Sequence, residues 1–351
     1  MMVDDTAAVN LLRRMLETRS LSGEEGELAQ LLAAWMSAHG FRVQRDEVGN
    51  VLGTTEPDAS SAGSGIVILG HMDTVPGDVP VECRDGKLYG RGAVDAKGPL
   101  AAAIVAAARA RGSIPVTVIG AVQEEASSVG ARHLTAMAPP RFLVIAEPSG
   151  ADAVVLGYKG SQRLTVEWTQ PCGHTAGAEP TAPERTVDFW NRLQRWCDDV
   201  SSGETGSFRR LTPRLIRMSS TSDDLHETAC LHIGMRLPPG TTAASVRDSL
   251  ERLWPEARFT FAPGEDPVLA GKSTPLVAAF LRSMRTTGAR PRFKTKTGTS
   301  DMNVVGPVWG CPMVAYGPGD SNLDHTPEEH VRVDEYLRGI AVLTGVLEGL
   351  E

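Results

Sequence analysis

In four short segments of this 351-residue chain an apolar run leads to a metal-binding residue type, directly in three of them and through a glycine-rich loop in the fourth. These residues are His71, the pair Glu124 and Glu125, Glu147, and the pair Asp324 and His325. Because the carboxyl ends of the strands of an open α/β sheet line one crevice, we expect the four segments to converge there. Carboxylates that share a crevice repel one another unless cations hold them. Imidazole and oxygen ligands together fit zinc, whereas calcium takes oxygen ligands only, so the sequence predicts a zinc site.

The spacing within these segments indicates separate tasks for single side chains. His71 and Asp73 stand two residues apart, so in an extended segment they share a face, and Asp73 can accept the second imidazole N–H. Asp95 lies in a glycine-rich turn, where the backbone can pass close to a metal pair that its carboxylate would bridge. Of the neighbours Glu124 and Glu125, one can bind metal while the other faces the bound water as general base.

The composition is that of an ordinary globular protein, with 41% apolar and 22% charged residues. None of the five cysteines forms a C-x-x-C pair, which excludes a thiolate zinc site and favours a reducing compartment. No signal peptide and no apolar run of bilayer length are visible, so we expect a cytoplasmic protein without membrane contact. The net charge of -8 argues against nucleic acid as a partner.

Two patterns of secondary structure divide the chain. Before residue 160 and after residue 263, helices alternate with apolar strands, as in a parallel or mixed sheet covered on both faces. In between, the order βαββαβ predicts a ferredoxin-like unit. We therefore expect an α/β domain of residues 1–159 and 264–351, with a smaller α+β domain of residues 160–263 inserted into it. The expected helices span residues 5–19, 24–39, 99–112, 183–200, 243–254, 275–287 and 333–347.

The motifs around these residues, in this order, resemble the M20 family of dizinc aminoacylases and peptidases over the whole chain. They read Gly70-His-Met-Asp-Thr-Val-Pro-Gly, Gly90-Arg-Gly-Ala-Val-Asp-Ala-Lys-Gly, Glu124-Glu125, Ala146-Glu-Pro-Ser and Leu323-Asp-His-Thr-Pro. The resemblance implies a zinc-peptidase-like mixed sheet flanked by helices, with the inserted domain as a lid or dimerisation domain. It implies one zinc ion on His71, Asp95 and Glu147. It implies a second on Asp95, Glu125 and His325, with cobalt as an alternative metal.

The same resemblance implies roles for residues outside the ligand set. Glu124 would be the general base and Asp73 the residue that orients the histidine. His174, in the inserted domain, would stabilise the tetrahedral oxyanion, and a histidine in a surface turn is the alternative. Arg236 would pair with the α-carboxylate of the substrate or form a structural ion pair. Thr297, Gly298 and Thr299 form a glycine turn whose donors would face the substrate backbone, or simply a turn that precedes the next strand.

Within the family, the chain is most similar to the LysK-type lysine and ornithine hydrolases of amino-group-carrier-dependent biosynthesis. The similar segments are Asp95-Ala-Lys-Gly-Pro-Leu-Ala, Glu147-Pro-Ser-Gly, Leu156-Gly-Tyr-Lys-Gly, Arg236-Leu-Pro-Pro-Gly and Lys296-Thr-Gly-Thr-Ser-Asp-Met-Asn. This similarity implies a homodimer that releases lysine or ornithine from an N-acylated precursor, which carries either an acetyl group or the glutamate of an acidic carrier protein. Acetylornithine, succinyl-diaminopimelate and dipeptides stay open as substrates. A metal-free binding protein and an oligomer scaffold are the non-enzymatic alternatives.

One segment of the inserted domain, Phe208–Arg217, concentrates positive charge within this acidic chain. Arg209, Arg210 and Arg214 belong either to an ordinary solvated face or to a surface that docks the acidic carrier.

Overall fold

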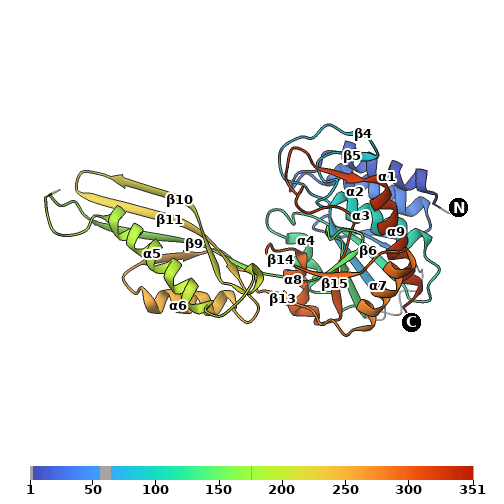
Figure 1. Cartoon of the computed structure of the whole chain (residues 1–351). Coiled ribbons are helices and arrows are strands. Elements are labelled where there is room, and N and C mark those ends of the chain that lie inside the picture. Colours follow the sequence, from blue (N-terminus) through green and yellow to red (C-terminus); the bar gives the residue numbers. More distant parts are fainter. Residues whose placement is uncertain (1–2, 56–64, 175, 351) are drawn as a thin grey trace. The chain divides into compact units, whose positions relative to one another are not determined.

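The computed structural model describes residues 3–55, 65–174 and 176–350, which form two compact units (Figure 1). Unit 1 comprises Met1–Gly157, Ala270–Thr295 and Ser300–Glu351, and unit 2 comprises Tyr158–Leu269 and Lys296–Thr299. The boundaries expected from the sequence, between residues 159 and 160 and between 263 and 264, lie within a few residues of the main segment of unit 2. The segment Lys296–Thr299 groups with unit 2, where the Lys159 N–H donates to the Lys296 carbonyl oxygen at 3.1 Å.

A large mixed sheet forms the centre of unit 1. Its strands lie in the order β1 (Arg42–Arg45), β2 (Val51–Thr54), β6 (Val116–Ala121), β3 (Ile66–His71), β7 (Phe142–Ile145), β15 (Met313–Ala315) and β8 (Ala153–Tyr158), and β14 (Arg292–Lys296) also pairs with β8. Strands β6, β3, β7 and β15 run parallel, whereas β2 and β8 run antiparallel to their neighbours. All residues of β3 and β7 are buried, as expected for apolar strands covered on both faces. The predicted α/β class is confirmed.

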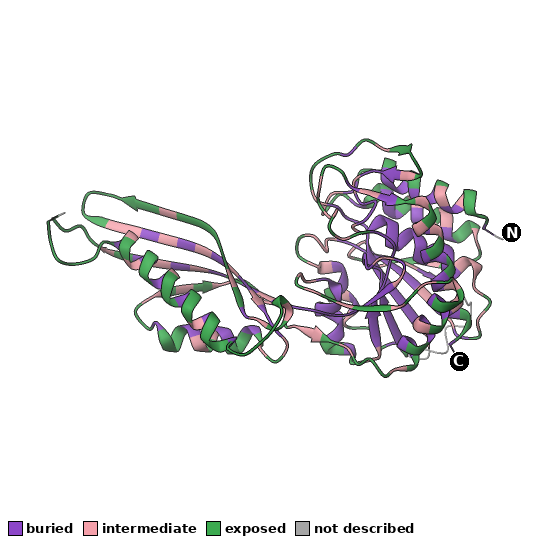
Figure 2. Cartoon of the chain, viewed as in Figure 1, coloured by how far each residue is buried: buried purple, intermediate pink, exposed green. Residues whose placement is uncertain are grey.

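Helices cover this sheet. They are α1 (Asp5–Glu17), α2 (Gly26–Ala38), α3 (Lys97–Arg109), α4 (Val129–Leu134), α7 (Pro275–Thr286), α8 (Asp301–Trp309) and α9 (Val333–Glu348). Buried residues, drawn in purple in Figure 2, make up most of the central strands and of the helix α3 beside them. The short α4 and α8 were not expected. Helix α3 is buried from Lys97 to Ala107 and packs against α1, α9 and β3, because its alanine side chains allow close approach. It begins two residues after Asp95.

A small sheet in unit 1 was not expected either. It consists of β16 (His330–Arg332), β5 (Lys87–Tyr89) and β4 (Glu82–Arg84), paired antiparallel in that order. Strands of three residues carry too little pattern to be found in a sequence. This sheet pairs His330 with Tyr89 and so brings the segment after His325 beside the glycine-rich turn.

Unit 2 follows the predicted order βαββαβ. Its elements are β9 (Gly160–Pro171), α5 (Ala182–Val200), β10 (Thr212–Ser222), β11 (His226–Leu237), α6 (Ala243–Leu253) and β12 (Arg258–Phe261). The sheet order is β10-β11-β9-β12 with antiparallel neighbours, the arrangement of a ferredoxin-like unit. One face packs on Phe189 and Leu193 of α5 and on Val246 and Leu250 of α6. Strand β10 lies at the edge.

Among the described residues, every helix is too short or too polar to cross a lipid bilayer.

Candidate metal centre

The carboxyl ends of the central strands carry most of the predicted ligands. His71 is the last residue of β3, Glu125 follows β6, and Glu147 follows β7. Asp95 precedes α3, and His325 lies in the loop between β15 and β16. The parallel register of β6, β3 and β7 brings these strand ends to one edge of the sheet, so five residues spread over most of the chain meet in unit 1.

The carboxylate of Asp95 lies between the two histidines. Its Oδ1 is 3.1 Å from His71 Nε2, and its Oδ2 is 3.1 Å from His325 Nε2. His325 Nε2 is also 2.7 Å from Glu125 Oε1, and His71 Nε2 is 3.6 Å from Glu147 Oε1. The site thus has two halves, each with one imidazole nitrogen and one further carboxylate, and Asp95 belongs to both.

This donor set is of the kind that holds a divalent metal ion. Ligand atoms of His71, Asp95 and Glu125 all lie within 4.8 Å of one another, close enough for one ion. Hydrogen bonds to Asp95 and Glu125 raise the pKa of His325 to about 10. Burial opposes the charged form of His71, but hydrogen bonds to Asp73 and Asp95 raise its pKa well above the usual value. Nitrogen and oxygen ligands of this kind suit zinc and its neighbours in the transition series.

Asp73 contacts both the His71 side chain and the backbone of Glu124 and Glu125. His71 Nδ1 lies 2.9 Å from the backbone oxygen of Asp73 and 3.4 Å from its Oδ1. Because a carbonyl oxygen only accepts, Nδ1 carries a proton, and Nε2 is the nitrogen that faces the ligand cluster. The fully buried carboxylate also accepts the Glu124 N–H at 3.0 Å, the Glu125 N–H at 3.1 Å and the Ser22 hydroxyl at 2.6 Å. Burial alone would raise the pKa of Asp73, but His71, the Ser22 hydroxyl and the Glu125 N–H lower it.

Glu124 lies next to the ligand cluster and is half-buried. Burial raises the pKa of this carboxyl well above its usual value, and although His71 opposes the shift, the carboxylates of Asp301, Glu147 and Glu125 add to it. The turn that carries Glu124 is strained, because Gln123 has a left-handed φ of 59°. The Gln123 N–H donates to Glu25 Oε1 at 3.0 Å, which helps to hold this conformation.

The residues expected to contact substrate all belong to unit 2. His174 is exposed, and its Nδ1 accepts the Ala176 N–H at 3.1 Å. Arg236 lies on β11 and is half-buried; its Nη1 is 3.4 Å from Thr299 Oγ1. Burial and the charge of Arg163 lower the pKa of Arg236. The structure therefore brings Arg236 to the loop that contains Thr297, Gly298 and Thr299.

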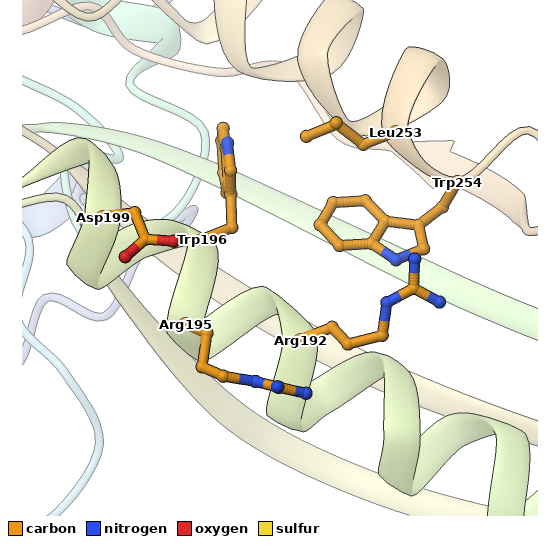
Figure 3. A pocket seen from close by; sticks show the side chains of 6 residues that line it. All are labelled: Arg192, Arg195, Trp196, Asp199, Leu253 and Trp254. Carbon is orange, nitrogen blue, oxygen red and sulfur yellow. The ribbon is translucent and has the colours of Figure 1, made fainter.

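Unit 2 also carries an open groove of about 510 Å³ between α5 and α6 (Figure 3). Its lining consists of Arg192, Arg195, Trp196, Asp199, Leu253 and Trp254. Arg192 covers the face of Trp254, with its guanidinium carbon 5.6 Å from the ring centre. None of the residues singled out in the sequence lines this groove.

Glu329, four residues after His325, is a further residue of the site and was not among the residues expected from the sequence. Its carboxylate is fully buried beneath the glycine-rich turn that carries Asp95. The sequence offers one weak signal, an acidic pair of Glu328 and Glu329 close to a ligand histidine, but it does not tell which of the two is buried.

Comparison with known proteins identifies the family of this chain. Residues 67–349 match the sequence model of a family described as Peptidase family M20/M25/M40. The chain is 41% identical to the LysW-lysine hydrolase of Deinococcus radiodurans, over 99% of this chain and 98% of that protein. It is 29% identical to the LysW-lysine/LysW-ornithine hydrolase of Saccharolobus islandicus, over 84% of both chains.

Among solved structures, the YXEP protein of Bacillus subtilis, described as a dinuclear metal-binding peptidase of the M20 family, superimposes with a TM-score of 0.73. The superposition covers 98% of this chain and 97% of that one, at 13% sequence identity, so it supports the fold. The resemblance drawn from the sequence motifs is confirmed: this chain belongs to Peptidase family M20/M25/M40.

Proposed function

We propose that this chain is a metal-dependent amide hydrolase that releases lysine or ornithine from the glutamate of an acidic carrier protein. The observation that carries the hydrolase assignment is the Asp95 carboxylate, whose two oxygens each face a different histidine at 3.1 Å. The substrate assignment is supported by the LysW-lysine hydrolase of Deinococcus radiodurans, which shares 41% of its residues with this chain. Five free cysteines fit a reducing compartment, and we assign the enzyme to the cytoplasm.

Two zinc ions fit the two halves of the site. We assign one to His71, Asp95 and Glu147, and the other to Asp95, Glu125 and His325. When bound, such a pair polarises the scissile carbonyl and lowers the pKa of bound water. Asp73 keeps the His71 imidazole oriented, because its backbone oxygen accepts from Nδ1 and leaves Nε2 for the metal.

Glu124 is our candidate for proton transfer. It is adjacent to Glu125 in sequence but is outside the assigned ligand set, so its carboxylate stays available for a proton. In the proposed reaction it accepts a proton from the attacking water and passes that proton to the leaving amine. Asp73 fixes the backbone of both glutamates, so the base and the ligand keep their relative positions.

We assign the substrate contacts to unit 2, and we propose the same unit as the dimer interface on the strength of the family resemblance alone. We assign the α-carboxylate of the substrate to Arg236, supported by its position beside Thr299, whose hydroxyl is a further donor. Thr297 and Gly298 belong to the same loop. We assign the oxyanion of the tetrahedral intermediate to His174.

We place carrier docking on the exposed arginines of the Phe208–Arg217 segment. Arg209 and Arg214 are exposed. Arg210 is half-buried and forms an ion pair with Asp198 at 2.7 Å, so its charge is already partnered within unit 2. Replacing Arg209 and Arg214 by serine is expected to flatten the salt dependence of kcat/KM for carrier-linked lysine, because long-range attraction of an acidic partner depends on ionic strength. Hydrolysis of acetyl-lysine is the control and should not change. An unaltered salt dependence with the carrier would remove this docking surface.

The decisive experiment replaces Glu124 by glutamine. Metal analysis should still find two zinc ions per chain, while kcat falls by about 10²- to 10⁴-fold, the usual contribution of a general base. Glu47→Gln is a matched control, since the side chain of Glu47 is 83% exposed. Near-normal turnover by Glu124→Gln would show that the mechanism is wrong. Cleavage of acetylornithine or a dipeptide, but not of carrier-linked lysine or ornithine, would refute the substrate and leave the hydrolase.

A further inference from the structure

We infer that Glu329 is a positioning residue for the metal centre: its carboxylate fixes the glycine-rich turn so that Asp95 presents one oxygen to each half of the site. The inference rests on the proposed function, because it concerns how the proposed bridging ligand is held.

The contacts of Glu329 are concentrated on this turn. Its Oε1 accepts three backbone N–H groups, those of Gly92 and Val94 at 3.0 Å each and that of Asp95 at 3.1 Å. Its Oε2 accepts from Arg91 Nη1 at 2.5 Å. A carboxylate that collects several backbone N–H groups acts as an anchor for the turn, as anions do in backbone nests. One of the three backbone N–H groups that Oε1 accepts is that of Asp95 itself.

The turn adopts a backbone conformation that depends on glycine and on close packing. Gly92 has a φ of 89°, in the left-handed region that disfavours other residues. A Cβ atom at Gly92 would lie 2.9 Å from the Lys97 side chain and 3.0 Å from that of Thr74. With the backbone packed this closely, the inward N–H groups depend on an acceptor inside the protein, and the carboxylate of Glu329 supplies it.

The position of Glu329 follows from the small sheet. Pairing of His330 with Tyr89 aligns β16 with β5, and the Gly90 N–H donates to the backbone oxygen of Glu329 at 3.3 Å. The same segment carries His325, whose Nε2 is 3.1 Å from Asp95 Oδ2. Residues 325–329 therefore hold Asp95 from two sides, through its side chain and through its backbone.

A second interpretation is that Glu329 serves only to neutralise Arg91, whose side chain is 13% exposed. The two interpretations differ in what happens when both charges are removed. If the backbone contacts matter, Arg91→Gln/Glu329→Gln keeps the defect of Glu329→Gln, because an amide oxygen is a weaker acceptor for three N–H groups than a carboxylate. If only the ion pair matters, the double variant regains normal metal binding.

The test measures metal binding directly. Metal-free wild type and variants are titrated with zinc against a chromogenic chelator, and with cobalt while the absorption spectrum is recorded, at a temperature where each is folded. We expect Glu329→Gln to bind zinc about 10- to 100-fold more weakly, as is usual when a residue that orients a metal ligand is lost. We also expect the absorption bands of the cobalt-bound variant to shift. Glu328→Gln, at the exposed neighbouring position, is the matched control and should behave as wild type.

Wild-type affinity and spectrum in Glu329→Gln, or their recovery in the double variant, would overturn the inference. If Glu329→Gln does not fold, Glu329→Asp, which keeps the charge but shortens the reach, is judged by the same criteria. Failure of the wild type to bind metal would instead refute the proposed function.

Discussion

Replacing Asp73 by asparagine tests how the ligand segments are held together. In the native protein, both oxygens of this buried carboxylate accept backbone N–H groups, Oδ1 from Glu124 and Oδ2 from Glu125. Asparagine has a similar shape but offers one oxygen and one NH2 group. Whichever way it turns, its NH2 group faces a backbone N–H. The less costly orientation points the NH2 group toward Ser22, whose hydroxyl can rotate and accept, and leaves the Glu125 N–H without an acceptor.

The size of the effect follows from this one lost acceptor. A buried donor without a partner costs about 1–3 kcal/mol of the free energy of unfolding. For a unit of roughly 150–250 residues, each kcal/mol lowers Tm by about 2–4 °C, so we expect a fall of roughly 2–12 °C in the metal-free protein. Since Asp73 also orients His71, metal affinity should fall by about 10- to 100-fold.

Thermal unfolding followed by circular dichroism, together with zinc titration against a chelator, checks both quantities. Asp78→Asn is the matched control, because Asp78 is exposed and lies, like Asp73, in the loop between β3 and β4. If Asp73→Asn unfolds at the same temperature as Asp78→Asn and binds zinc equally well, the reasoning about Asp73 is refuted.

Four further outcomes are expected. Removing metal with a chelator should lower Tm reversibly, because an ion present at 1,000 times its Kd contributes about 4 kcal/mol to stability. Gly98→Ala should reduce the free energy of unfolding in urea by about 1–3 kcal/mol, because the new Cβ would collide with a backbone carbonyl oxygen. Thr181→Ala removes the capping box of α5 and should cost about 0.5–2 kcal/mol in the same assay. In a thiol titration of the native protein, the exposed Cys83 and Cys172 should react, whereas Cys197 should stay protected, since burial raises its pKa to about 12.

Much of the fold could be predicted because its signals are local. The strands β3, β6 and β7 are unbroken apolar runs, and the long helix expected at residues 183–200 is Ala182–Val200 in the structure. Helix α8 was missed because Gly306 and Pro307 weaken its helical pattern. It forms because Ser300 caps its start and Val305 and Trp309 bury their side chains, and this burial depends on the rest of the chain.

The site was predictable to the extent that position along a strand determines it. His71, Glu125 and Glu147 follow apolar strands, so their convergence follows from a parallel sheet. Asp95 and His325 lie in loops. A glycine-rich turn suggested Asp95 as the bridging ligand and an apolar run upstream pointed to His325, whereas their division between two metal positions came from the motif resemblance. Glu329 could not be found, because its burial depends on the pairing of two three-residue strands, and the sequence around it reads as an ordinary polar loop.

The place of β15 in the sheet has a consequence for biosynthesis. This strand lies between β7 and β8, yet it is made after the whole of unit 2. A nascent chain, which folds from its N-terminus as it leaves the ribosome, can therefore complete unit 2 while the central sheet still lacks one of its inner strands. His71, Asp95 and Glu147 are synthesised early, whereas His325 emerges near the end. Of the two metal positions that we propose, the one on His71, Asp95 and Glu147 therefore has all its protein ligands synthesised long before the other.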